Sequence, residues 1–129
     1  MTDRMFVTIG GVDFELAYTF GAGREISQKI GDPLAIAREA AVEAMMSQAG
    51  LTYSPKWMPT VENVPMMLWI GAKHAGMGIK LEQVQEAVFA HGFLEAKEVA
   101  MGYLAGIVTP SAREKSDDAE GGSKADAGE

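Results

Sequence analysis

Few residues in this chain are suited to acid–base or nucleophilic chemistry. The 129 residues include no cysteine and two histidines, His74 and His91. Each histidine comes shortly before a glycine at a predicted helix end, where the helix dipole favours a polar or cationic side chain. Neither lies in the His-Glu-x-x-His pattern of a zinc protease. Because no nucleophile, base and orienting group can be assembled from this set, we expect no enzymatic activity, no metal and no cofactor.

Two acidic pairs and one glycine-rich turn are the remaining candidates for chemistry. Glu39 and Glu43 are one helical turn apart, as are Glu82 and Glu86, and paired carboxylates can act as general acid and base. Such pairs more often form a solvated helix face. Residues 20–24 (Phe-Gly-Ala-Gly-Arg) follow a predicted strand and open a predicted helix, but they lack the spacing of known phosphate-binding loops. We therefore interpret both features as structural.

Methionine is the residue type that indicates a function. The chain has nine, including two doublets, Met45 with Met46 and Met66 with Met67. Methionine fills cores, and it also lines adaptable binding surfaces because its side chain is unbranched and polarisable. Neighbours on a helix point about 100° apart, so a helix buried on one face cannot cover both members of a doublet. We expect these four residues, with Trp57 in a proline-containing loop, to bind a partner protein.

Composition limits the class of partner. The formal net charge is −7, which disfavours nucleic acid because phosphate binding needs clustered lysine and arginine. No apolar run reaches the roughly 20 residues of a membrane span. The first residues also lack the basic-then-apolar order of a signal peptide. We expect a cytoplasmic protein that binds neither nucleic acid nor membranes.

The N-terminal segment has the pattern of a β-hairpin. Residues 6–9 and 12–18 are rich in β-forming side chains and are separated by two glycines. A two-glycine connection predicts a tight turn, because both turn positions need positive φ. In the second run Phe14 and Leu16 fall on one face and Asp13 on the other, so one face is expected to be buried.

After residue 20 the spacing of apolar residues changes to that of helices. Asp32 is a typical helix cap, and Pro33 suits the first helical position. Pro55 and Pro59 predict a loop, since neither suits a helix interior. Five helices are predicted, the first from about residue 20 to 31 and three others over residues 34–48, 81–91 and 93–108. The remaining helix is expected to be capped by Thr60, Glu62 or Asn63, with Pro65 in its first turn, and to end near residue 75.

The chain is expected to form one domain followed by a tail. Residues 1–108 are predicted to be a mostly helical α+β domain with the hairpin packed on four or five helices. Residues 109–129 contain three basic and six acidic residues and no large apolar side chain. Such a segment cannot offset its chain entropy by burial, so it is predicted to be a disordered acidic tail. The expected core includes Phe14, Leu16, Ile26, Ile30, Leu68, Trp69, Val84, Val88, Val99 and Leu104.

The order of these motifs resembles the tail assembly chaperones of long-tailed phages and gene transfer agents. The resemblance covers about residues 6–108. It consists of the Gly-Gly turn, Leu-Ala-Tyr-Thr-Phe running into Arg-Glu-Ile and Lys-Ile-Gly-Asp, then Met-Leu-Trp-Ile-Gly-Ala-Lys-His-Ala, and finally Leu-Glu-Gln-Val with His-Gly-Phe. The stretch from Pro33 to Thr60 is longer than expected for the family.

The resemblance implies a protein that is not an enzyme. Such proteins bind the tape measure protein, keep its apolar helices soluble and help the tail tube to polymerise around it. The implied partners are the tape measure protein, the tail tube protein and further copies of the chain, in the cytoplasm of a bacterial host. Two other functions stay open. One is a structural subunit of the virion tail, whose hairpins pair edge to edge, and the other is a small helical adaptor unrelated to phage.

Overall fold

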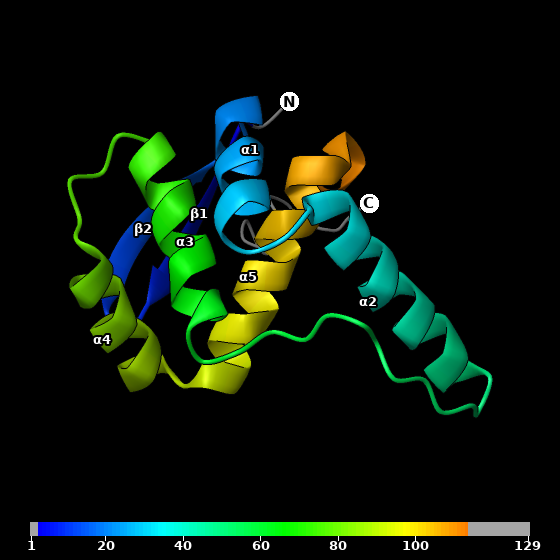
Figure 1. Ribbon diagram of the computed structural model, residues 1–129. Helices are drawn as coiled ribbons and strands as arrows, with labels where there is room; N and C mark the ends of the chain where they lie inside the picture. Colours follow the sequence, from blue (N-terminus) through cyan, green and yellow to red (C-terminus); the bar gives the residue numbers. More distant parts are fainter. Residues whose placement is uncertain (1–2, 114–129) are drawn as a thin grey trace, which may run out of the picture.

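The structure is a computed structural model, and it describes residues 3–113. Two strands are followed by five helices (Figure 1). This arrangement confirms the predicted α+β class, with an N-terminal hairpin packed on helices. In chain order the elements are β1 (Arg4–Ile9), β2 (Val12–Ala17), α1 (Phe20–Lys29), α2 (Pro33–Gln48), α3 (Asn63–His74), α4 (Leu81–His91) and α5 (Phe93–Val108).

The antiparallel hairpin of β1 and β2 turns at Gly10 and Gly11, as predicted. Their φ angles are 57° and 81°, in the region that this two-residue turn requires. Phe14 lies on the face that packs on the helices and is 1% exposed. On the opposite face Thr8 Oγ1 donates a hydrogen bond to Asp13 Oδ1 at 2.7 Å. The predicted division into a buried and a solvated face is therefore confirmed.

Helix α3 lies at the centre of the fold. It packs against β2, α1, α4 and α5. It begins at Asn63 with Glu62 as its N-cap, one of the three predicted cap positions, and Pro65 lies in its first turn as predicted. Thr60 Oγ1 accepts the backbone N–H of Asn63 at 2.9 Å, and Pro65 is tolerated because the first helical turn needs no internal N–H donor. Its buried residues are Val64, Pro65, Met67, Leu68, Ile70, Gly71 and Ala72.

Helix α2 extends away from the rest of the molecule, and the following segment runs back toward α3 (Figure 1). Asp32 Oδ1 accepts the backbone N–H of Leu34 at 3.1 Å, so the predicted cap is confirmed. Of the residues in α2, only Pro33 and Ile36 are buried. The N-terminal part of α2 thus belongs to the body, and its C-terminal part is largely exposed.

Helix α5 ends at Val108, before Pro110, as predicted. Residues 110–113 then form a further helical turn, and Arg113 Nε donates to the carbonyl oxygen of Gly106 at 2.5 Å. Residues 109–113, which the sequence analysis assigns to the tail, are therefore held against α5. The rest of the predicted tail, residues 114–129, lies outside the described residues.

The core receives side chains from the hairpin and from all five helices. Tyr103 is its largest fully buried side chain. Ile30, Trp69 and Val99 are partly buried and pack against the core instead of lying within it. The other seven residues predicted for the core are at most 1% exposed: Phe14, Leu16, Ile26, Leu68, Val84, Val88 and Leu104.

Candidate functional site

The four methionines predicted to bind a partner are not equally accessible. Met45 is 67% exposed, and Met46 is partly buried. Met66 is partly buried against the core, and Met67 is only 1% exposed. The expected exposure of Met67 is therefore wrong. The doublet argument assumed a helix with one open face, whereas α3 is covered by packed elements on several sides.

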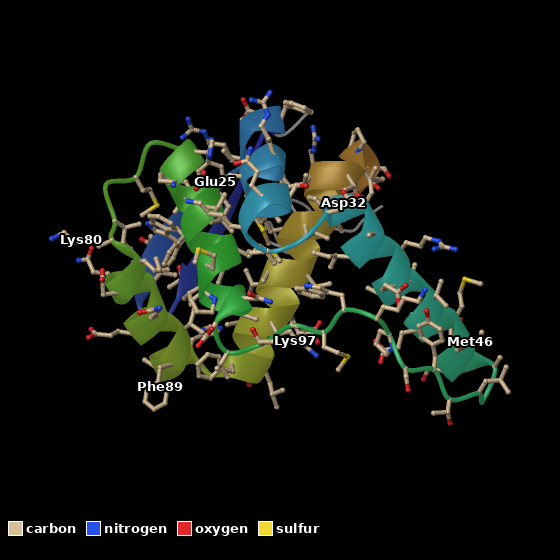
Figure 2. All side chains as sticks on the ribbon, in the orientation of Figure 1. Glu25, Asp32, Met46, Lys80, Phe89 and Lys97 are labelled. Atoms are coloured by element: carbon tan, nitrogen blue, oxygen red, sulfur yellow. The ribbon has the colours of Figure 1, made fainter. Side chains whose placement is uncertain are left out.

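Trp57 fixes the proline-containing loop instead of presenting itself to solvent. It is partly buried against the core. A Cβ placed on Gly31 would lie 3.5 Å from Trp57 Nε1 and 3.4 Å from Ile36 Cδ1, so the indole packs where α1 passes into α2. Met46 lies at the opposite end of α2 from Asp32 (Figure 2). Because Met67 is buried, the five predicted residues are not all available on the surface.

A different apolar surface is assembled where α1, α2 and α5 meet. It is a groove of about 540 Å³. Two large apolar side chains at its border are open to solvent, Phe20 at 78% and Leu34 at 67% exposure. This is the candidate functional site, and we call it the α1–α2–α5 groove. It is lined by Tyr18, Thr19, Phe20, Gly23, Arg24, Ser27, Asp32, Pro33, Leu34, Ile107, Val108 and Arg113.

The exposure of Phe20 and Leu34 follows from how the two helices begin. Thr19 Oγ1 accepts the N–H of Ala22 at 3.1 Å, so Phe20 is the first residue of α1. Asp32 caps α2 in the same way, and Leu34 is its second residue. Helical side chains tilt toward the N-terminus, so those of the first turn project past the start of the helix. Both residues therefore border the space between the helices. Asp32 lies at this junction (Figure 2).

Two arginines give the groove a positive border in a chain of net charge −7. The Arg24 guanidinium carbon lies 5.0 Å from the centre of the Phe20 ring. The Arg113 guanidinium carbon lies 5.2 Å from the centre of the Tyr18 ring. These distances are within the range of cation–π contacts. With Asp32 as the acidic residue in the lining, the groove suits an apolar segment that also carries acidic residues.

Tyr18, which lines the groove, stacks on the buried Tyr103. Their rings stack with centres 5.6 Å apart, and Tyr103 Oη donates to the carbonyl oxygen of Ala17 at 2.6 Å. Burial, together with the neighbouring Tyr18, raises the pKa of Tyr103 well above its usual range. Tyr103 therefore stays protonated and keeps this hydrogen bond at any physiological pH.

Both histidines and Glu39 are used in structural contacts, whereas Glu43, Glu82 and Glu86 are exposed. His91 Nδ1 accepts the backbone N–H of Gly10 at 3.1 Å and so fixes the hairpin turn to α4. His74 Nε2 lies 2.7 Å from Glu25 Oε1. Glu39 Oε1 accepts hydrogen bonds from the Lys56 backbone N–H and from Tyr53 Oη, both at 2.9 Å.

These hydrogen bonds, that from the Lys56 N–H foremost, lower the pKa of Glu39. Glu39 is therefore ionised at neutral pH and is a poor general acid.

Glu25 is the centre of an ion-pair cluster between α1 and α3. Its Oε2 accepts hydrogen bonds from Lys29 Nζ and Lys73 Nζ, both at 2.6 Å. Burial acts to raise the pKa of Glu25, but the hydrogen bonds from Lys29, Lys73 and His74 outweigh it and lower the pKa to about 2. Lys73 Nζ also lies 4.1 Å from the centre of the Trp69 ring. The cluster joins two helices and keeps the Glu25 carboxylate ionised near neutral pH.

Within residues 3–113, no group of three or more histidine and acidic side chains is placed to hold a metal ion. In the same part of the chain, no helix is both long enough and apolar enough to cross a membrane.

The chain was compared with protein families, curated proteins and solved structures. No family model, no curated protein and no solved structure matches it.

Proposed function

We propose that this protein is a tail assembly chaperone that binds an apolar helical segment of a tape measure protein in the α1–α2–α5 groove. The observation that carries the proposal is the pair of exposed side chains, Phe20 and Leu34, beside an apolar groove of about 540 Å³. Large exposed apolar side chains that border a groove are typical of protein-binding sites. The motif order of residues 6–108 supplies the identity of the partner.

The charge of the molecule supports this function. A net charge of −7 favours solubility while apolar surface is open. The local charge at the groove is positive, in contrast to the net charge of the chain, because Arg24 and Arg113 border it. A partner helix with acidic residues beside its apolar face would therefore be attracted to the groove and kept off the rest of the surface.

Co-expression with a tape measure protein from the same genome tests the proposal. We expect more soluble tape measure protein and its co-purification with the chain. Leu34→Glu and Phe20→Glu should each weaken the association about tenfold or more, because each places a charge against the apolar partner. Both side chains are more than 65% exposed, so the variants should fold like the wild type.

Met45→Glu is the matched control. Met45 is as exposed as Leu34 and belongs to the same helix, but it does not line the groove. Its substitution should leave the association unchanged. If the wild-type chain gives neither a gain in solubility nor co-purification, the chaperone function is excluded in favour of a tail structural subunit or an unrelated adaptor. Equal effects of all three substitutions would exclude the groove as the binding site.

A further inference from the structure

Among the described residues, 3–113, the outer edge of β1 makes no backbone hydrogen bonds beyond those with β2. Ile9 and Val12 flank the two-residue turn and face each other, so they exchange backbone hydrogen bonds. Hydrogen-bonded and non-hydrogen-bonded pairs alternate along an antiparallel hairpin. The N–H and C=O groups of Arg4, Phe6 and Thr8 must therefore point away from β2.

The outer edge of β2 is protected, in contrast to that of β1. The Glu15 backbone N–H donates to Met77 Sδ at 3.4 Å, and the Ala17 carbonyl oxygen accepts from Tyr103 Oη at 2.6 Å. Both groups point outward by the same alternation, which supports the assignment for β1. Besides β2, β1 packs mainly against α4, at the Gly10 turn. An edge strand without such cover is a template for pairing with another strand.

We propose that β1 pairs antiparallel with β1 of a second copy of this chain, about a twofold axis at Phe6. In this register Phe6 faces Phe6 of the second copy, and Arg4 faces Thr8 in both directions. All three facing pairs then use outward-pointing N–H and C=O groups. A shift of one residue would oppose groups already bonded to β2, and a shift of two residues would lose a pair.

The side chains fit the same register. Phe6 lies on the solvated face of the hairpin and is 48% exposed, so the two rings would cover each other beside the axis. Thr8 Oγ1 donates to Asp13 Oδ1. Arg4, which is paired with Glu15 of its own hairpin, would also lie next to Thr8 and Asp13 of the other copy, so opposite charges meet across the contact. Cross-strand pairs of these kinds stabilise sheets.

The assembly closes as a dimer. The resulting four-stranded sheet would have β2 at both ends, where Met77 and Tyr103 occupy the outer side. A twofold contact that uses the same edge on both copies leaves no further edge for growth. The geometry thus predicts dimers and no filaments. The pairing is small, so we expect a dissociation constant in the micromolar range or weaker, and tighter association as salt screens the net charge.

Sedimentation equilibrium of the full chain over a range of concentrations tests whether the β1 edges of two copies pair. We expect a monomer–dimer equilibrium for the wild type. Phe6→Pro removes an N–H that points away from β2, so the hairpin should persist while the dimer weakens about tenfold or more. Phe6→Lys sets two like charges opposite each other and should weaken the dimer to the same extent. It tests the pairing of the two strands if Phe6→Pro does not fold. A monomeric wild type, larger assemblies, or dimers unaffected by Phe6→Lys would overturn the proposal.

A single introduced cysteine tests the register, because the chain has none of its own. Facing Cα atoms in a hydrogen-bonded antiparallel pair are about 5.5 Å apart, within the range of a disulfide. Phe6→Cys should therefore give a covalent dimer under mild oxidation. Asp13→Cys is the control, since it lies on the same face but on the far strand. Equal cross-linking of the two variants, or none in Phe6→Cys, would overturn the twofold register.

Discussion

At the scale of single residues, the contact of Tyr18 with Gly106 determines how closely the hairpin approaches α5. A Cβ on Gly106 would lie 2.3 Å from Tyr18 Cε1, far inside contact distance. Gly102 is on the same helix, and a Cβ there would meet nothing within 4 Å. The two glycines therefore have different roles, although the sequence around them looks alike.

This difference gives a prediction with an internal control. Gly102→Ala should stabilise the protein by about 0.5–1 kcal/mol, because alanine has the higher helix propensity. Gly106→Ala should destabilise it by about 1–3 kcal/mol, because the Tyr18 ring must move. Urea denaturation of the two variants measures both changes. A stabilising Gly106→Ala would show that the ring moves without cost and would contradict the packing described for Tyr18.

At the scale of elements, the ion-pair cluster around Glu25 fixes α1 to α3. Lys29 belongs to the same helix as Glu25, whereas Lys73 and His74 come from α3. The Glu25 side chain is only 15% exposed, so these contacts are partly shielded from solvent and exceed an ordinary surface ion pair. The central helix α3 is thus held to the hairpin side by apolar packing and to α1 also by charge.

The cluster makes stability depend on pH. The pKa of Glu25 is lowered from 4.5 to about 2 on folding, so its contribution is complete above about pH 4.5 and is lost as the pH falls toward 2. Glu25→Gln should cost on the order of 1–3 kcal/mol at pH 7, and the difference from the wild type should shrink through this window. Denaturant titrations at several pH values measure it, with the exposed Glu86→Gln as control. A difference that is constant down to pH 2 would contradict the mechanism.

At the scale of the whole molecule, the folded body includes residues beyond the end of α5. Besides its bond to Gly106, Arg113 Nη2 donates to the carbonyl oxygen of Ile107 at 3.4 Å, and its guanidinium lies against the Tyr18 ring. These contacts satisfy carbonyl groups at the end of α5 that have no partner within the helix. The turn after Pro110 therefore closes the C-terminal end of the α1–α2–α5 groove.

Two truncated chains distinguish the contribution of this turn to stability from that of the residues that follow it. A chain that ends at Arg113 should keep the thermal stability of the full chain, because residues 114–129 carry no large apolar side chain. A chain that ends at Pro110 should melt about 4 °C lower or more, as should Arg113→Ala, since each loses the Arg113 contacts. Calorimetry compares the three with the full chain. A large loss on truncation after Arg113 would mean that the removed residues stabilise the fold.

The sequence by itself determined the features that depend on neighbours in the chain. Two consecutive glycines define the turn at residues 10–11, Asp32 before Pro33 defines the start of α2, and Gly92, with φ of 106°, separates α4 from α5. Each depends on a local backbone preference or a capping bond within a few residues, and such preferences can be recognised from residue types. The change in apolar spacing after residue 20 likewise predicted the α+β class.

Only the tertiary structure decided which surfaces stay open. Met45 and Met67 belong to similar doublets, yet α2 extends from the body while α3 is surrounded by it, so one methionine is exposed and the other is buried. The α1–α2–α5 groove likewise joins Tyr18, Leu34 and Val108, which are far apart in the sequence. The exposure of a side chain depends on which distant elements pack against its helix, and periodicity within one helix contains no information about how many of its faces they cover.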